Sequence, residues 1–329
     1  MCMAVLAVYP QGQTLHFGVG AVDAPEAATF TLASCTDAAI VAEQLLAWLE
    51  AAGFSGDQLE FIVTSGHLTE GPSGIYRWTQ SAQSAEPWAG ELCTVLSEYL
   101  SCPVYLIDPA SSAECHRHAL VTGTPAIQRP YFADYFIFKY LAREEALRRG
   151  LKQREGRFIV AHLDTVNQLG AVVGTRVVDC LTSADEGPFA LYHSGGLPFD
   201  EILRICDSAP QREQALQALT ENGGLRGYLG LENIADFYSQ RDEQSELIRQ
   251  ALVYQIAKEI GALAAALQGQ VDAIICAGEL ARFEPLIAEL TARVGFVAPL
   301  VAVPGQQGVS ALLAGARRVW EKEPIMNLS

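Results

Sequence analysis

The order of the predicted secondary-structure elements most constrains how this chain can fold, because the same order occurs twice. In the first half, three strands precede alternating helices and strands, with strands at 3–8, 14–22, 28–32, 59–64 and 104–107 and helices at 37–52, 87–100 and 133–149. In the second half, the strands are at 157–163, 170–174, 176–180, 271–276 and 297–303 and the helices at 199–206, 212–220, 234–241, 243–268, 285–294 and 308–322. Two such runs predict two α/β domains, each a mixed sheet covered by helices.

A charged segment at 148–157, which contains Gly150 and Gly156, separates the two runs. We therefore predict an N-terminal domain at 1–155 and a C-terminal domain at 156–307, with helix 308–322 packing back on the first domain. Ligands of α/β proteins bind at strand ends and at domain boundaries, so we expect an interdomain cleft.

The composition excludes some classes of partner. The chain has 329 residues and a formal net charge of -16, and no run of Lys or Arg stands out. Binding to nucleic acid needs clustered cations, and an acidic surface is repelled by anionic lipids, so we expect neither partner. The apolar stretch 251–267 is interrupted by Lys258 and Glu259 and predicts a core helix, not a membrane span. The apolar N-terminus lacks a basic start and predicts a strand, not a signal peptide, so we expect a cytoplasmic protein.

The eight cysteines are scattered and form no Cys-x-x-Cys pair, which argues against a zinc or redox motif. The segment Cys115-His116-Arg117-His118 holds three candidate metal ligands. A solvent-exposed helix surface is the favoured interpretation of this segment, and a metal site is the alternative.

Several motifs, in their order and spacing, resemble those of one enzyme family. They are Glu186-Gly187-Pro188-Phe189, Ser194-Gly195-Gly196-Leu197-Pro198 and the segment 254–261. The chain resembles butyrate kinases along almost its whole length and acetate kinases more distantly, in the superfamily of sugar kinases and actin. The resemblance implies an α/β fold of two actin-like (ribonuclease H-like) domains with mixed sheets. It also implies ATP and Mg²⁺ binding and phosphoryl transfer from ATP to butyrate or another short-chain carboxylate.

The resemblance also implies roles for individual residues. Catalytic roles fall on Asp108, His193 and Arg129, and Asp108 is also the candidate Mg²⁺ ligand. Nucleotide-binding roles fall on Gly12, Thr14, His162, Gly223, Gly224 and Gly278. Structural alternatives remain open, because Asp-Pro is a common turn starter, Arg129 can be a surface or capping residue, and glycines cap helices.

The chain departs from the family pattern at positions that the chemistry needs. Phosphoryl transfer depends on cations and N–H donors at the developing charge, and glycine loops let the backbone approach phosphate. Tyr9 and Gln11 replace the Asn and Gly of the first phosphate loop, and Asp164-Thr165-Val166 replaces three glycines of the second. The other departures are Ser65 and His193 for arginines, Asp134 for a histidine and Glu279 for a glycine.

These departures support two main hypotheses. Each lost contact costs about 3 kcal/mol of transition-state stabilisation, so the first hypothesis is a protein with lost or weak activity. Such a protein would act as a binding or assembly subunit, either as a homo-oligomer or together with an active relative. Its altered loops would oppose the binding of ATP and Mg²⁺. The second hypothesis is an active phosphotransferase with a rebuilt site for a different carboxylate, using Asp108, His162, His193 and either His67 or His16. A chaperone-like or sugar-kinase-like relative shares only the fold.

Overall fold

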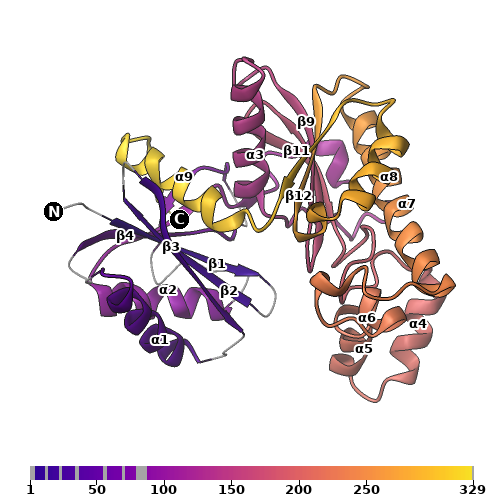
Figure 1. Cartoon of the computed structure of the whole chain (residues 1–329), viewed down its shortest axis with the longest axis horizontal. Coiled ribbons are helices and arrows are strands. Elements are labelled where there is room, and N and C mark those ends of the chain that lie inside the picture. The colour runs from indigo at the N-terminus through magenta and orange to yellow at the C-terminus, as the bar shows by residue number, and fades with distance from the viewer. Residues whose placement is uncertain are drawn as a thin grey trace. The chain divides into compact units, whose positions relative to one another are not determined.

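The computed structural model describes residues 4–11, 14–21, 24–33, 37–54, 58–68, 71–78 and 87–327. The chain divides into two units, which are coloured by residue number in Figure 1. The first unit consists of Met1–Glu114, Asp134–Tyr140 and Gln307–Ser329, and the second consists of Cys115–Ala133 and Leu141–Gln306. The second unit therefore includes residues before the predicted boundary at 155. The predicted domain limits, 1–155 and 156–307, stay a prediction.

The first unit is built on a mixed sheet. Its strand order, for the described residues, is β14-β6-β7-β4-β1-β2-β3. Strands β1, β2 and β3 are antiparallel neighbours, whereas β4 and β7 run parallel to β1. The bounds are β1 Ala4–Gln11, β2 Thr14–Ala21, β3 Ala24–Ala33, β4 Leu59–Thr64, β6 Ile75–Arg77, β7 Val104–Ile107 and β14 Ile325–Asn327. A separate parallel pair joins β5 (His67–Leu68) to β8 (Ala110–Ser111).

Helices cover both faces of this sheet. On one face, α1 (Ala38–Ala51) and α2 (Pro87–Leu100) pack against Leu6, Val8 and Phe17. On the other face, α9 (Gly308–Trp320) contacts β1 and β2 closely, because a Cβ atom at Gly18 would meet the Val309 side chain at 2.2 Å (Figure 1). The C-terminal helix therefore packs on the sheet that the N-terminus begins.

The start of α1 shows how local sequence sets a helix boundary. The Asp37 side chain accepts hydrogen bonds from the N–H groups of Ala39 and Ile40 at 2.9 and 3.3 Å. It satisfies donors that have no partner inside the helix. At the other end Gly53 has φ +84°, which L residues rarely adopt and glycine adopts freely.

The second unit repeats the core of the first. Its strand order is β11-β10-β9-β12-β13, with the same directions as β3-β2-β1-β4-β7. The bounds are β9 Arg157–Leu163, β10 Asn167–Val173, β11 Arg176–Thr182, β12 Ala273–Gly278 and β13 Leu300–Pro304. One face packs against α7 (Glu243–Ala266) and α8 (Glu284–Val294), which contribute Leu252, Ile256 and Leu290 to the core. Two mixed sheets that share this strand order confirm the predicted α/β fold class.

The connection from β11 to β12 contains α4 (Phe199–Ser208), α5 (Arg212–Thr220) and α6 (Gly224–Leu229) before α7. Helix α3 (Tyr135–Arg148) belongs to the first unit up to Tyr140 and to the second from Leu141. The remaining described helices are the 3₁₀ turns η2 Arg117–Leu120, η3 Ile234–Asp236 and η4 Glu279–Arg282. None of the helices in the described residues is apolar over a length that would span a membrane.

One helix prediction is wrong, and several short elements were not predicted. The segment 234–241 forms only the 3₁₀ turn Ile234–Asp236. Strands β5, β6, β8 and β14 and helix α6 have two to six residues each, which is too short for a periodic pattern to be recognised. The helix predicted from 133 begins at Tyr135.

Candidate functional site

Tyr9 lies near the end of β1, where the resemblance predicts a phosphate loop. Its side chain is buried, and its hydroxyl donates a hydrogen bond to Asp134 Oδ2 at 2.8 Å. The ring stacks against His16 with 5.9 Å between centroids and meets Phe136 edge-on. A Cβ atom at Gly308, the first residue of α9, would come within 2.2 Å of the Tyr9 ring. The ring therefore fills the space between the end of β1 and the start of α9.

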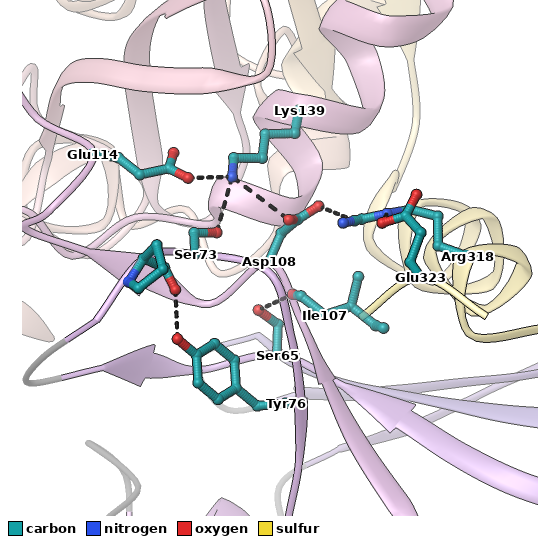
Figure 2. A network of polar contacts seen from close by, with 10 residues as sticks. Ser65, Ser73, Tyr76, Ile107, Asp108, Glu114, Lys139, Arg318 and Glu323 are labelled. Carbon is teal, nitrogen blue, oxygen red and sulfur yellow. Dashed lines mark hydrogen bonds and ion pairs between the residues drawn. The ribbon is translucent and has the colours of Figure 1, made fainter. Parts of the chain in front are cut away.

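Asp108 directly follows β7 and forms the centre of a buried ion network in the first unit (Figure 2). The residue is 2% exposed and has φ +42°, a left-handed conformation that aspartate tolerates better than most residues. Its Oδ2 accepts from Arg318 Nη1 at 2.6 Å, and its Oδ1 lies 3.5 Å from Lys139 Nζ. Both carboxylate oxygens therefore contact cations that α9 and α3 supply.

Further partners balance the charge of this network. Lys139 Nζ donates to Glu114 Oε1 at 2.6 Å and to Ser73 Oγ at 2.9 Å, and Arg318 Nε donates to Glu323 at 2.9 Å (Figure 2). Burial alone would lower the pKa of Arg318, but the Asp108 and Glu323 carboxylates raise this pKa above its ordinary value. Buried charges are tolerated when each has a partner of opposite sign, and this network meets that condition.

Arg129 lies in the second unit and is also engaged by carboxylates. Its Nη1 lies 2.6 Å from Asp179 Oδ1, and its Nε donates to Glu186. Burial alone would lower the pKa of Arg129, but these two carboxylates raise this pKa above its ordinary value. The guanidinium is thus bonded within the protein on two sides.

The carboxyl ends of β9 and β12 hold His162, Asp164 and Gly278. His162 is 0% exposed, and among the described residues neither ring nitrogen has a hydrogen-bond partner. Asp164 is 4% exposed and accepts hydrogen bonds from the Thr165 N–H at 2.8 Å and the Glu279 N–H at 3.3 Å. Gly278 has φ +98° and lies against the Leu163 carbonyl. The structure therefore brings His162, Asp164 and Gly278 to one edge of the second sheet.

Gly223 and Gly224 pack against the segment 190–194. A Cβ atom at Gly224, which has φ +55°, would lie 2.1 Å from the Ala190 carbonyl oxygen. A Cβ atom at Gly223 would lie 2.8 Å from the Ser194 nitrogen. His193, in the same segment, is partly buried, and burial lowers its pKa. The two glycines are thus explained by close packing within the chain.

The remaining predicted positions lie in the first unit. Thr14 begins β2 and pairs with Gln11 across the hairpin, whereas Gly12 lies outside the described residues. Ser65, which replaces an arginine, donates its hydroxyl hydrogen to the Ile107 carbonyl at 2.9 Å. Burial lowers the pKa of His67, and the charge of Asp134 opposes this effect. Among the residues with described placement, no group of three His, Cys, Asp or Glu side chains forms a metal cluster.

Sequence reasoning missed Lys139, Glu114 and Arg318. Lys139 interrupts the apolar run Tyr135-Phe136-Ile137-Phe138, and a single cation in such a run signals a buried charge with a partner. Glu114 and Arg318 carry no comparable local signal.

Solved structures of two carboxylate kinases resemble the chain over nearly its whole length. An acetate kinase from Porphyromonas gingivalis matches with a TM-score of 0.79 and 15% identity, covering 96% of this chain and 99% of its own. A propionate kinase from Francisella tularensis subsp. tularensis SCHU S4 matches with a TM-score of 0.77 and 11% identity, covering 94% of this chain and 98% of its own. At these identities the likeness defines the fold, which is the two-domain actin-like class.

Sequence comparison gives the family within that class. A protein of Caldanaerobacter subterraneus subsp. tengcongensis named "Probable butyrate kinase 2" is 31% identical over 292 residues, covering 84% of this chain and 82% of its own length. The chain belongs to the butyrate kinase family, among the acetokinases. No model in a scan of protein families matches the chain.

Family membership suggests ATP and Mg²⁺ as bound groups, and the contacts of three candidate positions bear on such binding. The Asp164 carboxylate accepts hydrogen bonds from the Thr165 and Glu279 N–H groups. Glu279 adds a second carboxylate, which is bonded to Arg282 at 2.7 Å. A Mg²⁺ ion at Asp108 would compete with Lys139 and Arg318 for the same oxygens.

Proposed function

We propose that this member of the butyrate kinase family has lost most or all ATP-dependent phosphotransfer to carboxylates and acts as a binding or assembly subunit. The observation that carries the proposal is the hydrogen bond from Tyr9 to Asp134. The resemblance assigns an asparagine of the phosphate loop and a catalytic histidine to these two positions. Tyr9 and Asp134 both differ from the family pattern, and they are hydrogen-bonded to each other. This bond supports a structural role for the two residues in place of a role in phosphate binding or catalysis.

The charged candidates support the same proposal. Catalysis of phosphoryl transfer needs cations that are already aimed at the transferring group. Arg129 is bonded to Asp179 and Glu186, and Arg318 and Lys139 are bonded to Asp108. Freeing any of these cations would remove one ion-pair partner from a buried or partly buried carboxylate, which is unfavourable.

The proposed subunit assembles with a second copy of itself or with an active relative, in the cytoplasm. The family scaffold supports this part of the proposal. The core helix α7 and the C-terminal helix α9 are both formed, whereas the phosphate loops differ from the pattern that the resemblance implies.

The test is formation of acyl phosphate from Mg-ATP and short carboxylic acids, butyrate included, with hydroxylamine as the trap. We expect no product above the level without enzyme, whereas an active butyrate kinase assayed in parallel gives product. Turnover comparable to that of the active relative would contradict the proposal.

An active phosphotransferase with a rebuilt site is the second candidate, and one observation favours it. Both ring nitrogens of His162 and the Nδ1 of His193 lack partners among the described residues. Free imidazole nitrogens suit proton transfer or a contact with an anion. If the trapping assay detects product with a carboxylate other than butyrate, His162→Asn should abolish that product. Retained activity in this variant would exclude a role for His162.

A further inference from the structure

The Asp164 side chain lies between two backbone segments of the second unit. Its Oδ1 accepts from the N–H of Thr165, in the turn after β9, at 2.8 Å. Its Oδ2 accepts from the N–H of Glu279, which follows β12, at 3.3 Å. One carboxylate therefore receives hydrogen bonds from the N–H of the next residue and from an N–H 115 positions further along the chain.

Close contact between the ends of β9 and β12 brings these donors together. Gly278, the last residue of β12, has φ +98°, and a Cβ atom there would lie 2.3 Å from the Leu163 carbonyl oxygen. Another residue at this position would push the strand ends apart. The glycine therefore lets the Glu279 N–H reach the side chain that follows Leu163.

The surroundings are suited to an oxyanion. Backbone N–H groups that converge on one point form anion-binding concavities, and ligands of open α/β sheets bind at the carboxyl ends of parallel strands. His162, two residues earlier in β9, is fully buried with both ring nitrogens unpartnered among the described residues, and the Thr165 hydroxyl oxygen is also unpartnered there. Polar groups at two positions within two residues of Asp164 in the chain thus lack a hydrogen-bond partner among the described residues.

We propose that the Asp164 carboxylate is a tethered anion that occupies a phosphate-binding cradle made by this chain's own backbone. The proposal rests on the proposed function and gives a physical cause for it, since the carboxylate excludes the phosphate groups of a nucleotide. A tethered group competes at high effective concentration, and its charge repels an incoming phosphate. Removal of the side chain frees both N–H groups for a phosphate oxygen.

The experiment compares the wild-type protein with Asp164→Gly and Asp164→Asn by calorimetric titration with inorganic tripolyphosphate and with Mg-ATP at fixed ionic strength. The control is Asp207→Asn, which makes the same change in net charge on the exposed surface of α4. We expect Asp164→Gly to bind tripolyphosphate and Mg-ATP at least about tenfold more tightly than the wild-type protein and the control. Asp164→Asn keeps one acceptor oxygen and should show a smaller gain in the same direction.

If the folded Asp164→Gly variant binds tripolyphosphate and Mg-ATP no more tightly than the wild-type protein, the inference is overturned. If Asp164→Gly fails to fold, Asp164→Asn decides, and binding no tighter than that of Asp207→Asn overturns the inference. The proposed function is tested separately by turnover. Acyl phosphate formation by the wild-type protein at a rate comparable to that of the active relative contradicts the proposed function, whereas an inactive wild-type protein with unchanged binding by Asp164→Gly contradicts only the inference.

Discussion

Lys139 illustrates at the scale of a single residue how a buried charge is stabilised by its partners. The side chain is 2% exposed, and Nζ contacts Asp108, Glu114 and Ser73. An ammonium group in such a place is stable only as part of the network, and its removal leaves two buried carboxylates without this cation.

We expect Lys139→Met to lower the free energy of unfolding by about 3–5 kcal/mol, because Asp108 and Glu114 lose a buried partner. Urea denaturation followed by circular dichroism measures the effect. The control is Lys152→Met, at a lysine whose side chain is 82% exposed, where we expect little change. Equal effects of the two substitutions would show that the network does not depend on Lys139.

His193 should make stability depend on pH. Burial lowers its pKa in the folded state below the ordinary value of 6.5, so the unfolded chain takes up a proton first as pH falls. The stability contribution is fully present above pH 6.5 and is lost as pH falls toward the folded pKa. Urea midpoints of the wild-type protein measured from pH 8 to pH 5 should therefore fall more steeply than those of His193→Asn. Parallel profiles would contradict this expectation.

At the scale of the secondary-structure element, the ends of the central strands position the polar residues. Asp108 follows β7, Asp164 follows β9 and Gly278 ends β12. The residues before each end are mostly buried on both faces of the sheet, and the chain leaves the sheet where the apolar pattern stops. The strand therefore sets the position of the polar residue at its end. The neighbouring element determines what the side chain of that residue contacts.

The contact between β9 and β12 should depend on Gly278. Gly278→Ala introduces both an unfavourable φ of +98° and a contact of 2.3 Å with the Leu163 carbonyl. Gly269→Ala is the matched control, because φ there is +72° but no atom lies within 4 Å. We expect a loss of about 1 kcal/mol for the control and a clearly larger loss for Gly278→Ala, measured by urea denaturation. Equal losses would show that the strand ends move apart without difficulty.

At the scale of the whole molecule, the net charge of -16 is the property that acts on the entire folded chain. A chain with this excess of carboxylates repels itself in the compact state, and salt screens the repulsion. The charge bears on solubility and stability, and the fold is set by the two apolar cores.

We therefore expect the melting temperature to rise when NaCl is increased from about 0.01 to 0.15 M, since the Debye length falls from roughly 30 to 8 Å. The buried pairs around Asp108 are screened little by salt, so screening of surface repulsion should dominate. Differential scanning calorimetry at fixed pH measures the change. A melting temperature that falls over this range would show that surface ion pairs outweigh the net repulsion.

The sequence by itself determined the fold class, the family and most of the regular elements. Strands such as β9 and β4 were predicted at their observed bounds, because a short, mostly apolar run is a local signal that burial on both faces requires. The motifs at Glu186–Phe189 and Ser194–Pro198, with their spacing, indicated the butyrate kinase family, which the comparisons confirm.

The tertiary structure decided what the candidate side chains contact. Tyr9 bonds to a residue 125 positions away, Asp108 to one 210 positions away, and Asp164 to a backbone N–H 115 positions away. No local pattern encodes such partners, because they meet only after the sheets have formed and the helices have packed. The departures from the family pattern could therefore be recognised in the sequence, whereas the ion network of Asp108 and the hydrogen bonds of Tyr9 and Asp164 required the folded chain.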